Sequence, residues 1–182
     1  VGCVATAGAQ IMKYWSWPPY GLVAGWNDTY DWPNMPDNAT TSSPTAVQAA
    51  VAELNHEVGV AVGMEYGCDA SGAYTYDMIN VYELYYNYHS SCALLTREYY
   101  TASDWFDFIK GQINANRPIH YRIPGHSIVC DGWGYYGTAM IYHMNYGWAN
   151  NATTWYVVDA LQGGDIYEEY MLISIVPLVA MG

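Results

Sequence analysis

Apolar residues recur at helical spacing through the first two thirds of the chain. Near the start, Cys3, Ala7, Ile11 and Tyr14 follow one another at steps of three or four residues. This spacing predicts a helix over roughly residues 2–14, with the cysteine in its first turn and with small residues that let another element approach closely. The same pattern predicts further helices over the segments 45–59, 73–88 and 101–118.

Two of these helices carry start signals. Ser43 and Pro44 precede the second helix in the order typical of an N-cap and a first helical position, and Gly59 is expected to end it. Thr101 and Asp104 have the spacing of a capping box in which Asp takes the usual place of Glu.

The pattern changes after Pro118. Five stretches alternate or run with β-branched and aromatic residues, separated by Gly-rich turns: IHYRI, HSIVCDGW, AMIYHMNYGW, TWYVVDAL and EYMLISIV. Helices followed by antiparallel strands indicate an α+β fold with two lobes facing one another. We expect one domain over residues 1–182, with a mainly helical lobe over 1–117 and a mainly antiparallel sheet lobe over 118–182.

Composition narrows the choice of partners. The chain has 182 residues, with 5 Lys or Arg against 17 Asp or Glu, and its net charge is −12. Such a charge repels nucleic acid and anionic membranes, so neither is expected as a partner. The 20 tyrosines against 2 phenylalanines indicate aromatic surface that tolerates water, either in a cleft for peptide or carbohydrate or in a core with polar tips.

Cys3 has two interpretations. The four cysteines, Cys3, Cys68, Cys92 and Cys130, match neither a CxxC redox motif nor a zinc-ribbon spacing. Cys3 is either a buried small residue near a chain end or a reactive thiolate. A helix N-terminus supplies partial positive charge and unpaired N–H groups that lower the pKa of a thiol, and a nearby imidazole can take the proton.

His126 has the most suggestive position among the histidines. It starts a strand directly after a Pro-Gly turn, in IPGHSIVCDGW, which predicts an imidazole at a sheet edge or cleft mouth. Asn145, in HMNYGW, lies one hairpin later, where its amide can accept the ring N–H and fix the tautomer, as in Cys-His-Asn sites. The other histidines are expected to be helix-face residues or satisfied strand residues: His56, His89, His120 and His143.

Longer motifs surround these residues. GCVATAGAQIMKYWSWP closely resembles the nucleophile motif of the streptopain family of bacterial cysteine peptidases, whose signature reads much like GCVATAxAQIMKY followed by a proline. The similarity continues in order through VAELNHEVGVAVGMEYG, DGWGYYGTAMIYHMNYGW and WYVVDAL, and it covers most of the chain. This resemblance makes the nucleophile the favoured interpretation of Cys3.

The resemblance implies a papain-like α+β fold with the active site in the cleft between the lobes. Cys3 would match the family's nucleophile, and His126 the histidine of its GHAFVIDG-like segment. Asn145 would match the asparagine of its HVNWGWGG-like segment, which orients the imidazole.

The resemblance also implies partners and location. The family is secreted, is made with an N-terminal propeptide, cleaves proteins and needs no metal or other cofactor. Protein or peptide substrates, and the propeptide or an upstream chain, are therefore the expected partners. Gly125, Tyr146 and Trp148 flank the histidine and the asparagine and are the expected substrate contacts.

The chain departs from the family pattern in three places. The family has Trp directly after the asparagine, shielding the His–Asn contact; here Tyr146 stands there, and we expect weaker insulation because its hydroxyl admits water. The loop QGGDIYEEY is much shorter than in streptopain, which affects the substrate range. Papain-like peptidases also use an upstream Gln in the oxyanion hole, which Gln10 cannot replace, so we expect an upstream segment to complete the domain.

Two other functions stay open. A Cys–His pair serves any acyl transfer, so a transglutaminase- or acyltransferase-like enzyme is one alternative, and product analysis with an added amine separates it from a peptidase. A catalytically impaired or inactive papain-like binding module is the other, and a burst of acyl-enzyme with a peptide ester would argue against it. Cys130 shares a strand face with His126, as in a metal pair, but a core cysteine is the favoured interpretation.

Overall fold

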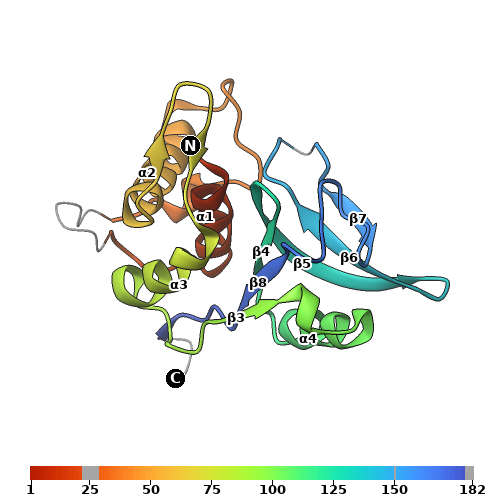
Figure 1. The fold of residues 1–182 in the computed structure, drawn as a ribbon. Coiled ribbons are helices and arrows are strands. Elements are labelled where there is room, and N and C mark those ends of the chain that lie inside the picture. Colours follow the sequence, from red (N-terminus) through yellow and green to blue (C-terminus); the bar gives the residue numbers. More distant parts are fainter. Residues whose placement is uncertain (22–28, 150, 179–182) are drawn as a thin grey trace. The chain divides into compact units, whose positions relative to one another are not determined.

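The structure, a computed structural model, describes residues 1–21, 29–149 and 151–178. It divides into two compact units: Val1–His89 with the segment that starts at Pro177, and Ser90–Val176. The first is mainly helical and the second is built on an antiparallel sheet (Figure 1). The predicted α+β class is confirmed. Among the described residues, no helix is long and apolar enough to cross a membrane.

Two long helices and a small hairpin organise the helical unit. Its elements are α1 (Cys3–Trp15), η1 (Trp32–Asn34), α2 (Thr45–Ala61), β1 (Glu65–Tyr66), β2 (Ser71–Gly72), η2 (Thr75–Asp77), α3 (Met78–Asn80) and η3 (Val81–Tyr85). Gly8 on α1 lets two neighbouring side chains come close, because a Cβ there would lie 2.6 Å from Met78 Cε and 3.3 Å from Val58 Cγ1. The predicted close approach at the small residues of this helix is confirmed.

The second helix differs from its prediction at both ends. Pro44, not Ser43, is the N-cap of α2, since the Ser43 hydroxyl accepts a bond of 3.0 Å from the Thr40 N–H instead. Gly59 does not end the helix. It leaves room for the hydroxyl of Tyr66, which packs against the position that a Cβ would occupy.

The sheet unit places a strand from the end of the chain inside the sheet. Its elements are β3 (Ala93–Thr96), η4 (Arg97–Tyr99), α4 (Ala102–Asn114), β4 (Ile119–Ile123), β5 (His126–Tyr136), β6 (Ala139–Asn145), β7 (Thr154–Val157) and β8 (Tyr170–Ile173). The strand order is β3-β8-β4-β5-β6-β7, and every pair is antiparallel. All five predicted strands are present, whereas β3 was not predicted.

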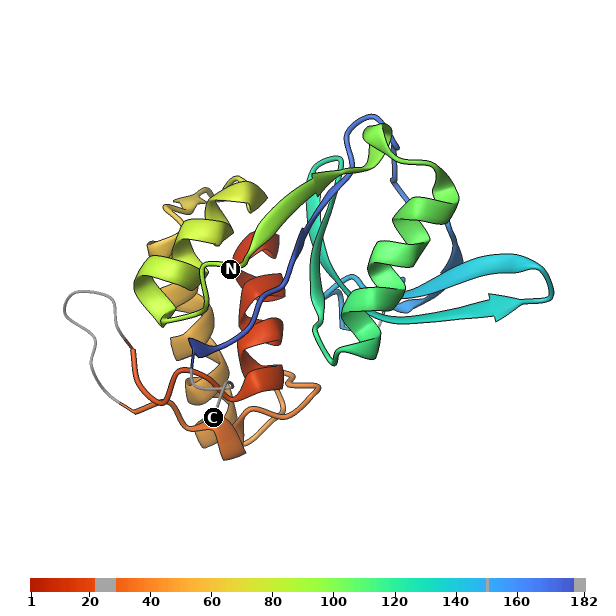
Figure 2. The same ribbon diagram turned by 90° about the horizontal axis from the view of Figure 1, so that it is seen from below.

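The helix α4 covers one face of this sheet (Figure 2), and the hydrophobic core of the unit lies between the helix and the strands. Trp105, Phe106 and Ile109 of the helix are fully or almost fully buried against strand residues such as Tyr121 and Tyr142. The predicted capping box starts the helix, since the Thr101 hydroxyl accepts a bond of 3.2 Å from the Asp104 N–H. α4 lies within the predicted helical lobe of residues 1–117, but it packs on the sheet and belongs to the second unit.

Candidate active site

Cys3, the predicted nucleophile, is the first residue of α1 and is partly exposed. Gly2 is the N-cap in extended conformation, with φ −83° and ψ 156°, and the first turn contains no acidic residue. The positive end of the helix dipole therefore stabilises a thiolate at this position, and no carboxylate in that turn opposes it.

The small hairpin of the helical unit packs against the start of α1. A Cβ on Gly2 would lie 2.7 Å from Met64 Cε and 3.1 Å from the carbonyl oxygen of Ser71 on β2. Only glycine fits this space without displacing its neighbours. The contacts among Gly2, Met64 and Ser71 were not predicted from the sequence. The glycine directly before Cys3 was the one residue that could have indicated this close packing.

His126 is the first residue of β5, as predicted, and directly follows Gly125, whose φ of +68° makes the turn. Its Nε2 lies 2.9 Å from the carbonyl oxygen of Tyr146. Its ring stacks on the indole of Trp148, with ring centroids 4.5 Å apart and planes inclined by 25°. The hydrogen bond to the Tyr146 carbonyl fixes the position of Nε2, and stacking on Trp148 fixes the plane of the ring.

The contact with Tyr146 also fixes the tautomer of His126. A carbonyl oxygen can only accept a hydrogen bond, so Nε2 must carry the hydrogen. In the neutral imidazole the basic nitrogen is then Nδ1. His126 is therefore prepared to take up a proton at Nδ1.

Tyr146 supports His126 from inside the protein. Its side chain is only 1% exposed, and its hydroxyl donates a bond of 2.9 Å to the carbonyl oxygen of Gln162. Burial raises the pKa of this phenol above its usual range, so it stays neutral. The expectation that the hydroxyl admits water is wrong, because Gln162 engages it. The side chain offers almost no surface to a substrate, whereas that of Trp148 is 46% exposed.

Asn145 organises the turn that carries these two residues. It is the last residue of β6, opposite Val129 of β5. Its Oδ1 accepts bonds from the Gly147 N–H at 2.9 Å and from the Thr153 hydroxyl at 3.4 Å. These bonds hold the turn that carries the Tyr146 carbonyl and the Trp148 ring. The predicted bond from Asn145 to the His126 ring stays a prediction, and Thr153 is a support that sequence reasoning missed.

Two further predictions concern buried residues of the sheet. Cys130 is fully buried in the core, and burial raises the pKa of its thiol above the usual range, so the core interpretation is confirmed. His120 is also fully buried, with Nε2 3.3 Å from the Ser127 hydroxyl, and is a satisfied sheet histidine as predicted. Across residues 1–21, 29–149 and 151–178, no group of three or more His, Cys, Asp and Glu side chains is arranged to hold a metal ion.

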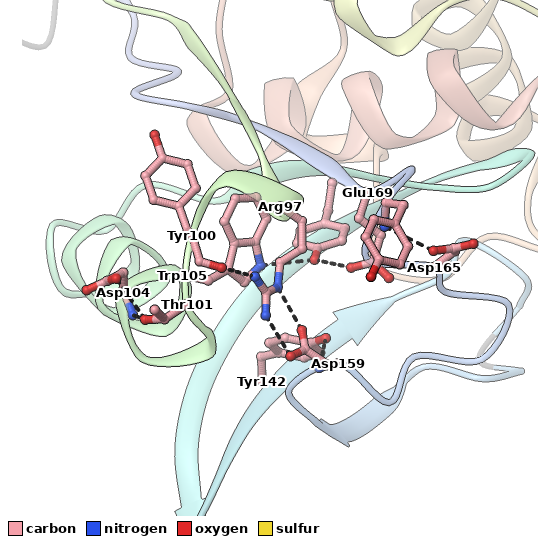
Figure 3. A network of polar contacts seen from close by, with 11 residues as sticks. Arg97, Tyr100, Thr101, Asp104, Trp105, Tyr142, Asp159, Asp165 and Glu169 are labelled. Atoms are coloured by element: carbon pink, nitrogen blue, oxygen red, sulfur yellow. Dashed lines mark hydrogen bonds and ion pairs between the residues drawn. The ribbon is translucent and has the colours of Figure 1, made fainter.

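A polar network in the sheet unit is centred on the buried Arg97 (Figure 3). The guanidinium Nε and Nη2 donate to the Asp159 carboxylate at 2.7 and 2.6 Å, and Nη1 donates to the Tyr100 carbonyl at 2.5 Å. Two parallel bonds to one carboxylate give this ion pair a defined geometry.

Glu169 continues the network. The Tyr121 hydroxyl donates to its carboxylate at 2.5 Å and accepts from the Trp105 indole N–H at 3.1 Å. Burial raises the pKa of the Glu169 carboxyl. Asp159 precedes the short loop QGGDIYEEY and Glu169 lies near its end, so the network fixes both ends of this loop.

Comparison with known protein families shows which family has this set of residues. The sequence model of the Peptidase C10 family matches residues 1–156, a range that includes Cys3, His126 and Asn145. The chain belongs to the peptidase C10 family. This confirms the resemblance to streptopain.

Relatives in the peptidase C10 family include longer proteins. The chain is 28% identical over 186 residues to the thiol protease/hemagglutinin PrtT of Porphyromonas gingivalis, covering 91% of this chain and 21% of that protein. It is 28% identical over 185 residues to streptopain of Streptococcus pyogenes, covering 88% of this chain and 46% of that protein. The chain thus spans less than half the length of these relatives.

Solved structures of the same kind show the fold. A fragment of prointerpain A from Prevotella intermedia, a cysteine-to-alanine mutant, matches with a TM-score of 0.81 and 30% identity over 96% of this chain and 63% of that one. The active wild-type interpain A cysteine protease of the same organism matches with a TM-score of 0.78 and 30% identity, covering 94% of this chain and 81% of that one. The papain-like fold is therefore confirmed.

Proposed function

We propose that this chain is the catalytic part of a secreted cysteine endopeptidase that hydrolyses peptide bonds in proteins. Cys3 would be its nucleophile and His126 its general acid and base. The observation that carries the proposal is the bond between His126 Nε2 and the Tyr146 carbonyl, which leaves Nδ1 as the proton-accepting nitrogen. Family membership and the position of Cys3 at the start of α1 support it.

The proposed reaction is acyl transfer to water. The Cys3 thiolate attacks the peptide carbonyl, and protonated His126 gives its Nδ1 proton to the leaving amine. Water then hydrolyses the thioester, with His126 as the base. The stacked Trp148 ring keeps the imidazole plane constant through both proton transfers.

The tetrahedral intermediate needs hydrogen-bond donors for its oxyanion. We assign one of them to the backbone N–H of Cys3, which lies at the positive end of the α1 dipole and belongs to the proposed nucleophile itself. The side chain of a glutamine upstream of Val1 is the second donor that the resemblance to papain-like peptidases predicts.

Replacement of Cys3 tests the proposal. In the full-length protein, Cys3→Ala is expected to lower peptide hydrolysis by at least about 10³-fold and to abolish labelling by a thiol-directed epoxide. Cys68→Ala removes another exposed thiol and is the matched control, which should keep both properties. Labelling that persists at Cys68, Cys92 or Cys130 in the Cys3→Ala protein would contradict the assignment.

The products distinguish the alternative functions. With a peptide ester, a peptidase gives a burst of acyl-enzyme followed by hydrolysis, and an added amine should not replace water as the main acceptor. Dominant transfer to the amine would indicate a transglutaminase- or acyltransferase-like enzyme. No burst, together with tight peptide binding, would indicate a binding module.

The proposed secretion rests on the family resemblance. The low content of Lys and Arg, 5 residues in the chain, is consistent with it. Immunodetection of the protein in culture medium and in washed cells of the producing organism tests it, and protein confined to the cell interior would contradict it.

A further inference from the structure

An exposed tryptophan, Trp155, lies on the sheet face that α4 does not cover. In the register of β5, β6 and β7, the row of Trp133, Tyr142 and Tyr156 packs toward the core cluster. The next row along the strands is Gly132, His143 and Trp155. Side chains of successive residues alternate between faces, so this second row points away from the core. The Trp155 side chain is 49% exposed.

The indole of Trp155 packs against two glycines of β5. A Cβ on Gly132 would lie 3.2 Å from Trp155 Cη2, and a Cβ on Gly134 would lie 3.6 Å from Trp155 Cζ3. The ring therefore lies across two positions of β5 that have no side chain. A larger residue at Gly132 would push the indole away from the sheet.

A histidine–aspartate pair holds one edge of this ring. His143 Nδ1 lies 2.5 Å from Asp131 Oδ1, and the His143 ring meets the Trp155 ring edge-on, with centroids 5.3 Å apart. Asp131 stands at the β-bulge between Cys130 and Gly132. A bulge redirects side chains locally, and here it sets a carboxylate beside the imidazole.

This surface continues from the proposed catalytic residues. Asn145 and His143 are two residues apart on β6, so they share a face and lie about 7 Å apart along the strand. Trp155 is directly opposite His143 on β7. β5 and β6 form a long hairpin in both ribbon views (Figures 1 and 2), and Gly132 and His143 pair across it. An extended peptide rises about 3.3 Å per residue, so it reaches Trp155 about two to four residues from the bond that is cleaved.

We propose that Trp155, seated on Gly132 and Gly134 and held by His143, forms a subsite for an apolar side chain of the substrate. This inference rests on the proposed peptidase function. Ile141 and the exposed Val157, which pair with one another on the same face, extend the apolar surface beyond the indole. A preordered indole loses little freedom on binding, and covering it removes apolar surface from water. A peptide side chain is therefore the occupant, and Trp155 is a specificity-determining residue.

Peptides that differ at one position test this subsite. A series of internally quenched peptides carries either Leu or Gly at the second, third or fourth residue on each side of the cleaved bond. At one of these positions, Leu should raise kcat/KM by about 5- to 10-fold over Gly, as expected for burial of one apolar side chain. In Trp155→Ala this preference should vanish, so that the kcat/KM values of the Leu and Gly peptides differ by less than about two-fold.

Two further variants complete the test. Tyr99→Ala, which removes a 76% exposed aromatic residue beside α4, should keep the preference for Leu. Gly132→Ala should weaken the preference without removing any contacting side chain, and circular dichroism checks that all variants fold. A preference for Leu that survives in Trp155→Ala, or the absence of any such preference in the wild type, would overturn the subsite.

Binding measurements separate this inference from the proposed activity. In the Cys3→Ala protein, the preferred Leu peptide should bind about 5- to 10-fold more tightly than the Gly peptide, and adding Trp155→Ala should remove this difference. If the wild type cleaves no peptide but these affinities differ as expected, the peptidase function fails and the subsite stands. If cleavage occurs and the affinities do not differ, the subsite fails alone.

Discussion

His126 is held by two neighbours that act in different ways. Tyr146 contributes its backbone carbonyl, and Trp148 contributes its ring. A backbone hydrogen bond survives a change of side chain, so position 146 can hold Tyr where the family pattern has Trp. The stacking function depends on the side chain and falls to Trp148, which matches the family's second Trp.

The Tyr146 hydroxyl should therefore matter for stability and little for catalysis. Tyr146→Phe removes the hydrogen bond from the Tyr146 hydroxyl to the Gln162 carbonyl, which should lower the free energy of unfolding by about 0.5–1.5 kcal/mol. The contact between His126 and the backbone remains, so kcat/KM should stay within about three-fold of wild type.

Urea unfolding and peptide hydrolysis measure the two effects. Tyr167→Phe, at an exposed tyrosine of the same unit, is the control and should change neither quantity. A large loss of activity in Tyr146→Phe at unchanged stability would show that the hydroxyl acts on His126.

At the scale of elements, the loop after the DAL segment is held at both ends by the network of Arg97. Arg97 follows β3 and bonds to Asp159 before the loop, and its N–H donates to the carbonyl of Glu169 near the end of the loop. Removal of the guanidinium should release the Asp159 end alone, because the backbone N–H of Arg97 still holds the Glu169 end.

Arg97→Ala is expected to be strongly destabilising. It leaves the Asp159 carboxylate without its partner, which should lower the free energy of unfolding by about 3 kcal/mol, while Arg97→Lys should lose less because it keeps the charge. Lys110→Ala breaks a surface pair with Asp107 and should have a much smaller effect. Urea unfolding of the three variants measures this order, and equal losses for Arg97→Ala and Lys110→Ala would contradict it.

The elements predicted correctly are those with a strong local pattern. α4 has a capping box and a clear apolar face, and β4 is IHYRI as predicted. β1 and β2 were missed because two residues are too few for a period to show, whereas β3 stands among the helices of the sequence and pairs with the distant β8.

In the candidate site, too, the residues within a strong sequence pattern were predictable and the others were not. Cys3, His126 and Asn145 stand in long motifs, whereas the carbonyl of Tyr146 and the space at Gly2 involve the backbone, which carries no residue type. Trp155 was seen only as part of a strand. Its role needs the register that brings it beside His143, and register depends on which strands pair.

For the whole molecule, the buried His120 links stability to pH. Burial lowers its pKa to about 3, against about 6.5 in an unfolded chain. As the pH falls through 6.5 the unfolded chain binds a proton that the native protein does not, so the native state loses stability progressively down to about pH 3.

His120→Leu should remove this part of the acid sensitivity. Between pH 7 and pH 4, the wild type should lose about 3 kcal/mol more unfolding free energy than the variant. Urea unfolding at several pH values gives both profiles. Parallel profiles would contradict the assignment to His120.

The position of β8 has a consequence for timing. This strand is synthesised after every other strand that the structure describes, yet it lies between β3 and β4 inside the sheet. Until residues 170–173 leave the ribosome, the two strands lack their common neighbour and the sheet stays in two pieces. His126 therefore receives its finished sheet only after residue 173 has been made. Until then, a nascent chain of the proposed peptidase lacks the continuous sheet that carries His126.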